Sequence, residues 1–149
     1  MRQGGGSIHK GAVGMLLSSV MIWGCTVSDP GYNVALKNDS DARLVVRVAG
    51  PGHAGGPRAW ALPPHAAGWV LSTLGPPREA SPITYEIVDE ESCAVIGIQR
   101  VDFALAPNPG YSQFIVVVGA DRSLRVDART SADPTIDANL DKTASCPTA

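Results

Sequence analysis

From residue 32 onward, hydrophobic residues recur at every second position over much of the chain. Successive side chains of a β-strand point to opposite faces, so this spacing is typical of strands with one buried face. The segments that show it are 32–36, 44–48, 59–62, 68–71, 83–87, 94–103, 112–120 and 121–128. The polar stretches NDSD (38–41) and GADR (119–122) predict turns. Long helical periodicity is absent, which favours an all-β protein.

About eight short strands separated by turns predict two packed sheets, immunoglobulin-like in architecture, with seven to eight strands. The segments 94–103 and 112–120 are the most apolar, so we expect them to form central strands. A tryptophan between paired cysteines marks true antibody-type domains, but Trp60 and Trp69 precede both later cysteines. The expected likeness is therefore one of architecture alone, and a small barrel is the alternative.

A mainly apolar run precedes the strand-rich part of the chain. Residues 12–23, AVGMLLSSVMIW, follow a start that carries Arg2 and Lys10 but no acidic residue. A bilayer span needs about 20 residues, so this run is too short to cross a membrane. Its length and its basic flank are instead typical of the hydrophobic region of a signal peptide. The chain is therefore expected to be exported.

The end of this run, Ile22-Trp23-Gly24-Cys25, resembles the lipobox of bacterial lipoproteins: an aliphatic, a variable and a small residue, then cysteine. In that family the thiol receives a diacylglycerol, the peptide is cut before the cysteine, and the new amino group is often acylated. The resemblance implies that Cys25 carries lipid and that residues 1–24 are removed. Trp23 departs from the family, in which small residues are usual at that position. The alternatives are a secretory signal cut elsewhere and a buried cytosolic helix.

This interpretation divides the chain into four parts. They are a signal peptide (1–24), a lipidated tether (25–31), a β-sandwich (32–128) and a polar C-terminal tail (129–149). A tether of this length reaches at most about 20 Å when fully extended. The resemblance thus implies a domain held close to a bacterial membrane in the cell envelope, and secretion without lipid is the alternative.

The number of cysteines agrees with a lipid anchor. With Cys25 assigned to lipid, Cys93 and Cys146 remain as a pair. A disulfide is the default in an oxidising compartment, and this one would fasten the polar tail to the domain. Neither residue lies in a Cys-x-x-Cys arrangement, which argues against a redox motif or a zinc knuckle. Two unpaired thiols are the alternative.

Charge excludes one class of partner. The chain has 12 basic and 14 acidic residues and a formal charge of −2. Removal of residues 1–24 takes away two basic residues and no acidic one, which makes the charge more negative. No run of Lys and Arg is present, so nucleic acid is not an expected partner.

Three polar motifs invite a functional interpretation, but simpler ones are favoured. GPGHAG (50–55) has Gly-x-Gly-x-x-Gly spacing but no helix start after it, so a surface loop is expected. His53 and His65 are the only histidines after the signal, whereas zinc or copper usually needs three or more ligands. DEES (89–92) lacks the spaced ligands of a calcium loop and is expected to be a hairpin turn. Asn38-Asp39-Ser40 is a glycosylation sequon, relevant only in a eukaryotic source.

The segment AWALPPHAAGWVL (59–71) carries the one aromatic ambiguity. If it forms a hairpin with its loop at 63–68, four side chains share one face: Trp60, Leu62, Trp69 and Leu71. Facing inward they are core, which is favoured because large apolar clusters are normally buried. Facing outward, Trp60 and Trp69 form a platform for a sugar or a protein partner.

The sequence as a whole predicts a non-enzymatic envelope lipoprotein, acting as a binding or structural module without cofactor or metal. Its expected partner is the membrane, through the lipid on Cys25, and a further protein or glycan partner is not identified. The alternatives are a secreted carbohydrate- or protein-binding sandwich that uses Trp60 and Trp69, and a small hydrolase or metal enzyme. No catalytic serine elbow of the Gly-x-Ser-x-Gly type is present.

Overall fold

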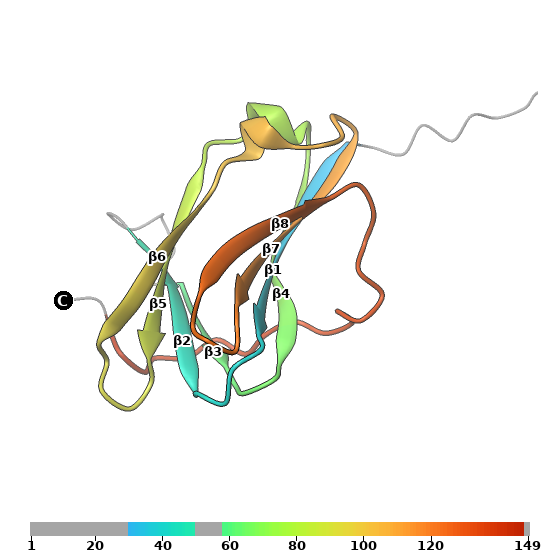
Figure 1. The fold of residues 1–149 in the computed structure, drawn as a ribbon. Helices are drawn as coiled ribbons and strands as arrows, with labels where there is room; N and C mark the ends of the chain where they lie inside the picture. Colours follow the sequence, from blue (N-terminus) through green and yellow to red (C-terminus); the bar gives the residue numbers. More distant parts are fainter. Residues whose placement is uncertain (1–29, 50–57, 148–149) are drawn as a thin grey trace, which may run out of the picture.

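Two four-stranded sheets pack face to face in the computed structural model, which describes residues 30–49 and 58–147 (Figure 1). The strand orders are β4-β1-β7-β8 in the first sheet and β3-β2-β5-β6 in the second. The strands are β1 (Gly31–Asn38), β2 (Leu44–Val48), β3 (Ala59–Leu62), β4 (Ala67–Leu74), β5 (Ile83–Asp89), β6 (Val95–Val101), β7 (Tyr111–Val118) and β8 (Leu124–Arg129). Two 3-10 helices are η1 (Pro77–Glu79) and η2 (Phe103–Leu105). The predicted all-β sandwich is confirmed.

The first sheet is mixed and the second is antiparallel. β1 runs parallel to β7, with Gly31 opposite Tyr111 and Asn38 opposite Val118, and antiparallel to β4. All three strand pairs of the second sheet are antiparallel. Constant-type immunoglobulin domains order their strands A-B-E-D and C-F-G. This chain therefore shares their two-layer architecture and not their strand order.

The main core lies between the sheets and is made of the alternating apolar side chains. Its buried members are Val34, Leu36, Leu44, Val46, Trp60, Leu62, Tyr85, Ile87, Val101, Phe103, Ala106, Phe114, Val116 and Val118. The ring of Phe103 lies 4.5 Å from that of Tyr32 and 5.1 Å from that of Phe114, between ring centroids. η2 thereby closes one end of the core, and the period-two pattern in the sequence corresponds to the buried faces of the strands.

The two most apolar segments occupy different places. Segment 112–120 forms β7, a central strand that is buried at every residue after Tyr111, as predicted. The prediction for segment 94–103 is wrong, because β6 is the edge strand of the second sheet. Val95 and Ile98 are 47% and 60% exposed. Both faces of β7 are covered, whereas the outer face of β6 is exposed. A run of apolar residues in the sequence does not distinguish these two situations.

The tryptophan hairpin considered above does not form. β3 pairs with β2 in the second sheet, whereas β4 pairs with β1 in the first, so the chain crosses between the sheets. Pro63 and Pro64 lie in this connection and have no N–H groups for a ladder. His65 follows in a left-handed conformation with φ 53°. Alternation within each strand is the same in a hairpin and in a crossing connection, so the pattern did not distinguish them.

Residues 130–147, here called the strap, wrap around one side of the sandwich (Figure 1). Trp69 of β4 donates its N–H to the carbonyl of Ala138 at 2.9 Å and accepts from the N–H of Leu140 at 3.0 Å. The strap then reaches β3, where Ala61 donates to Asp141 and Thr143 donates to Ala59. These bonds satisfy backbone groups on the edges of both sheets, where unpaired groups favour aggregation.

The strap also covers apolar surface on the outer faces of the sheets. Ile136 packs on the first sheet against three buried side chains, Ala35, Ile115 and Val117. Cys146 packs on the second sheet in a cluster with Val45, Ala59 and Val88. The strap therefore adds a small outer layer to each of the two sheets. Figure 1 shows the strap passing from β8 to the side of β5 and β6.

Polar contacts fix both ends of the strap. Near its start, the buried Gln113 accepts a bond from the backbone N–H of Asp133 at 2.7 Å. Near its end, Arg47 donates to the carbonyls of Cys146 and Pro147 while it pairs with Glu86 at 2.7 Å. Charge-assisted bonds of this kind are stronger than those between neutral groups.

The predicted disulfide between Cys93 and Cys146 is confirmed, with 5.2 Å between the Cα atoms. Cys93 lies in the turn between β5 and β6, and Cys146 is the penultimate described residue of the strap. The bond joins positions 53 residues apart and so fastens the strap to the second sheet covalently.

Gly68 of β4 leaves the space that the strap needs. A Cβ at this position would lie 2.7 Å from Cγ of Leu140 and 3.0 Å from the carbonyl oxygen of Ala138. Both contacts are shorter than normal van der Waals separations. At the opposite edge, a Cβ on Gly97 would overlap Leu124, where β6 approaches β8. Each glycine thus permits a close approach across the side of the sandwich.

The double variant Cys93→Ala/Cys146→Ala is expected to lower the free energy of unfolding by about 4 kcal/mol, because a loop-closure constraint on the unfolded chain is lost. Urea denaturation checks this value. A reductant should destabilise the wild type to a similar extent and leave the double variant unchanged. Equal stability of oxidised and reduced wild type would contradict the expectation.

The substitution Gly68→Ala is expected to cost about 1–3 kcal/mol through overpacking against the strap. The tryptophan emission should shift to the red, because Trp69 loses part of its cover. Leu140→Ala is the partner for a double-mutant cycle, and its combination with Gly68→Ala should cost less than the sum of the two. If the two changes in unfolding free energy were simply additive, the side chains at positions 68 and 140 would not interact.

Candidate functional site

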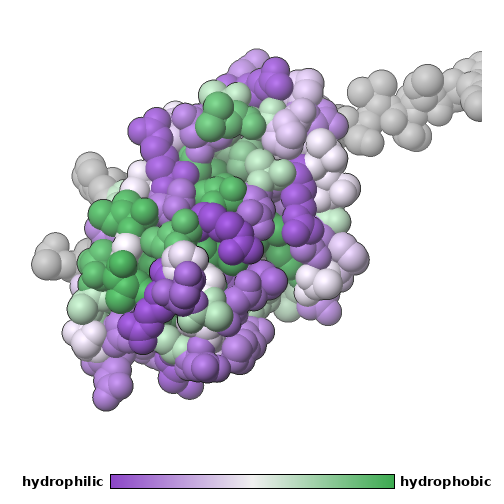
Figure 2. Space-filling model, viewed as in Figure 1, coloured by the Kyte–Doolittle hydropathy of each residue, from purple (hydrophilic) through white to green (hydrophobic). Residues whose placement is uncertain are grey.

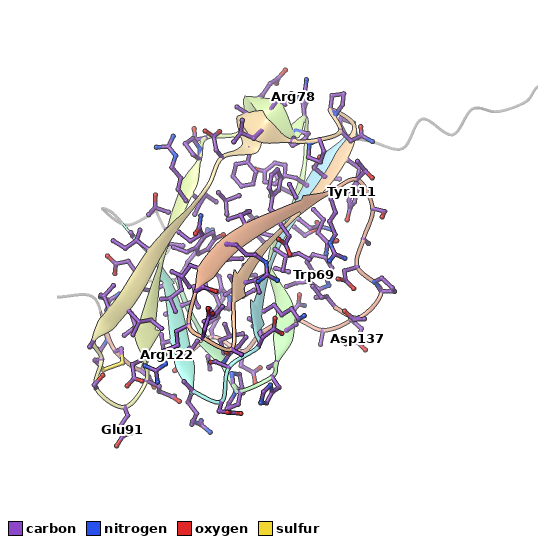
Figure 3. All side chains as sticks on the ribbon, in the orientation of Figure 1. Trp69, Arg78, Glu91, Tyr111, Arg122 and Asp137 are labelled. Atoms are coloured by element: carbon purple, nitrogen blue, oxygen red, sulfur yellow. A yellow bond between two sulfur atoms is a disulfide. The ribbon has the colours of Figure 1, made fainter. Side chains whose placement is uncertain are left out.

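A charged pocket lies at the end of the sandwich opposite η1 and η2. Three connections form it: β1–β2 (39–43), β5–β6 (90–94) and β7–β8 (119–123). Its volume is about 500 Å³ and its lining residues are Asp41, Ala42, Arg43, Asp89, Glu90, Glu91 and Arg122. Figure 3 labels Glu91 and Arg122 at this end, close to the disulfide. The β5–β6 turn was predicted from DEES and is confirmed.

Charges of both signs meet in this pocket. Nε of Arg43 donates to Oε2 of Glu90 at 2.7 Å, with the side chains 70% and 23% exposed. Arg122 projects from the β7–β8 turn, where its backbone is left-handed at φ 64° and its N–H bonds to the carbonyl of Gly119. Exposed pairs of this type contribute at most about 1 kcal/mol. The pocket therefore presents ion-pairing groups without a buried charge.

Asp89 is held in its ionised form. The backbone N–H and the hydroxyl of Ser92 both donate to Oδ1 of Asp89 at 2.9 Å. These bonds, the backbone bond first, lower the pKa of Asp89 below its ordinary value. A carboxylate with a lowered pKa is ionised at neutral pH and is not a proton donor there. Asp89 is therefore shifted away from the raised pKa that a carboxyl general acid requires.

Of the two histidines that follow the apolar run, the structure describes His65. His65 lies in the connection between the sheets, with its Nε2 2.8 Å from Oδ1 of Asp41 in the β1–β2 turn. Both side chains are largely exposed, at 64% and 99%. His53 and the whole glycine-rich motif 50–55 lie outside the described residues. Among residues 30–49 and 58–147, no three His, Cys, Asp or Glu side chains are grouped to hold a metal.

Asn38 has a structural role that the sequence did not reveal. It is completely buried, and its Nδ2 donates to the carbonyls of Ala42, Leu62 and Pro63. Its Oδ1 accepts from the backbone and the hydroxyl of Ser40. Asn38 thereby joins the β1–β2 turn to the connection between the sheets. The sequon amide is fully used, so a glycan on it would break these bonds.

The two tryptophans lie in different layers. Trp60 is 5% exposed and faces the main core, with its ring centroid 6.4 Å from that of Tyr85. Trp69 lies on the outer face of the first sheet, packed with the cluster around Ile136. Its Nε1 donates to the carbonyl of Ile136 at 3.0 Å, and Figure 3 labels it beneath the strap. The two rings do not share a face, so they form no common platform.

Neither a family model nor a curated protein sequence matches the chain. The helical part of the described structure is limited to η1 and η2, and none of the helices among the described residues has the length and hydropathy to span a bilayer. The lipobox-like residues 22–25, including Cys25, lie outside the described residues.

The substitution Ser92→Ala is expected to raise the pKa of Asp89 part of the way toward its ordinary value of 3.8, because the hydroxyl bond is lost while the backbone bond remains. A carboxyl-carbon NMR titration measures it. Asp121, whose pKa is lowered by Ser123 in the next turn, is the internal control and should not change. Because the native pKa of Asp89 is depressed, its contribution to stability is lost as pH falls through that pKa, and this loss should be smaller in the variant.

Proposed function

We propose that this protein is a lipoprotein of the bacterial cell envelope, anchored by lipid on Cys25 and acting as a non-enzymatic binding or structural module. The observation that carries the proposal is the position of Cys25 directly after an apolar run of signal-peptide length. The Cys93–Cys146 bond supports it, because disulfides persist in oxidising compartments outside the cytosol.

The charged pocket is the candidate contact site of this module. It is hollowed, it is built by three separate connections, and it offers carboxylates and guanidinium groups to a ligand with charges of either sign. Its carboxylates lack the geometry of a dedicated calcium loop. These features support binding through ion pairs more than they support catalysis.

The other candidate functions receive less support. A sugar platform requires two exposed aromatic rings on one face, and Trp60 and Trp69 are on different layers. Many hydrolases use a nucleophile activated by a base, or a water polarised by a metal, and others use a carboxyl group with a raised pKa. The lowered pKa of Asp89 disfavours proton donation by this carboxyl group.

The deciding experiment is the intact mass of the protein extracted from membranes, measured with and without reduction. The expected mass is that of residues 25–149 plus lipid, and about 2 Da less before reduction because one disulfide removes two hydrogens. Cys25→Ser is the matched control and should yield no lipidated form. A lipid-free wild-type mass, or one that retains residues 1–24, would overturn the anchor.

A further inference from the structure

The two ends of the sandwich differ sharply in character. One end contains η1, η2 and the start of β1, and its exposed apolar residues include Leu74, Pro76, Ala104, Leu105, Pro107 and Pro109. We call these six residues the apolar end. Leu74 and Leu105 are 79% and 75% exposed, the highest fractions among the exposed large hydrophobic side chains of the described chain. Figure 2 shows a small apolar patch at this end, bordered by hydrophilic surface.

Hydrogen bonds tie together the elements that carry the apolar end. Gly75 donates its N–H to the carbonyl of Pro30 at 2.7 Å, and Gly31 donates to that of Gly110 at 2.8 Å. Arg78 of η1 donates to the carbonyl of Ala106 at 3.0 Å, which joins η1 to η2. Figure 3 labels Arg78 at this end. The two leucines are therefore carried by elements that are tied both to each other and to the first described residue.

The opposite end is strongly charged. Six carboxylates lie in its connections or at their borders, against three basic side chains: Asp39, Asp41, Asp89, Glu90, Glu91 and Asp121, with Lys37, Arg43 and Arg122. At the apolar end, η1 contains Arg78 and Glu79, and Asp102 precedes η2 with Arg100 beside it at the end of β6. An anionic lipid surface repels the acidic end and favours contact with the end that has fewer carboxylates and exposes leucine.

The point where the chain enters the sandwich decides which end is nearest the anchor. Pro30 is at the apolar end, five positions after Cys25 in the sequence. Such a segment spans at most about 18 Å even when fully extended. An eight-residue strand such as β1 is about 26 Å long. The anchor therefore reaches the surface around the apolar end and not the charged pocket at the far end.

We infer that the apolar end is a membrane-contacting surface: Leu74 and Leu105 rest in the headgroup region of the phospholipid layer that holds the anchor, with the charged pocket directed away from it. This inference rests on the lipid anchor proposed above and adds an orientation to it. The lipid on Cys25 holds the protein at the membrane, and burial of two exposed leucines in the headgroup region fixes which end of the sandwich faces it. The orientation presents the candidate contact site to the aqueous side.

The test uses the lipidated full-length protein in vesicles of phosphatidylethanolamine and phosphatidylglycerol whose acyl chains are brominated near the headgroup. An environment-sensitive fluorophore is attached through Ala104→Cys or, in a separate preparation, through Asp41→Cys at the charged end. Bromine should quench the fluorophore at position 104 several-fold more than the one at position 41. Equal quenching at the two positions, or stronger quenching at position 41, would overturn the orientation.

Surface variants separate a specific contact from simple proximity. The pair Leu74→Ser/Leu105→Ser should reduce quenching at position 104, because the apolar contact with lipid is removed. Ile98→Ser, which changes a 60% exposed apolar residue on edge strand β6, is the matched control and should leave quenching unchanged. An equal effect of both changes would contradict the assigned surface.

The intact mass of each preparation keeps the two proposals apart. A lipidated mass with equal quenching would overturn the orientation and leave the anchor standing. A lipid-free mass would overturn both. Since all the variant residues are exposed, circular dichroism and thermal unfolding should match those of the wild type in every preparation.

Discussion

The strap held by the Cys93–Cys146 disulfide is the constraint on which the rest of the structure depends. Two sheets pressed together leave edge strands and outer faces that the strands themselves cannot cover. In this chain, residues 130–147 bond to the edges at β4 and β3 and place Ile136 and Cys146 on opposite outer faces. A polar segment of this composition would not hold such a path without covalent closure, because ordering each of its residues costs conformational entropy.

The strap also explains where the aromatic residues lie. Trp69 would be an exposed ring on the first sheet if the strap were absent, since its Nε1 and its backbone groups are bonded to strap residues. Gly68 beside it leaves space for Leu140. The strap therefore covers the ring of Trp69, which would otherwise be exposed and available for binding, and makes it part of a small second core.

The two ends of the molecule have separate physical roles in the proposed envelope lipoprotein. One end combines the start of β1 with exposed leucine and proline, and the other combines the charged pocket with the disulfide. The four residues between Cys25 and Pro30 cannot reverse this arrangement, because their extended reach is shorter than β1. In the proposed arrangement, the lipid anchor and the candidate contact site therefore lie at opposite ends of the sandwich.

The sequence by itself determined the features that depend on local pattern. Period-two alternation located the eight strands, and cysteine counting identified Cys93 and Cys146 as partners, because both follow from the nature of strands and of oxidised thiols. The tertiary structure alone decided that β6 is an edge strand, that β3 and β4 belong to different sheets, and that Asn38 is a buried hub. These properties depend on which segment covers which face, and alternation within a strand is identical whether its neighbour is another strand, the strap or water.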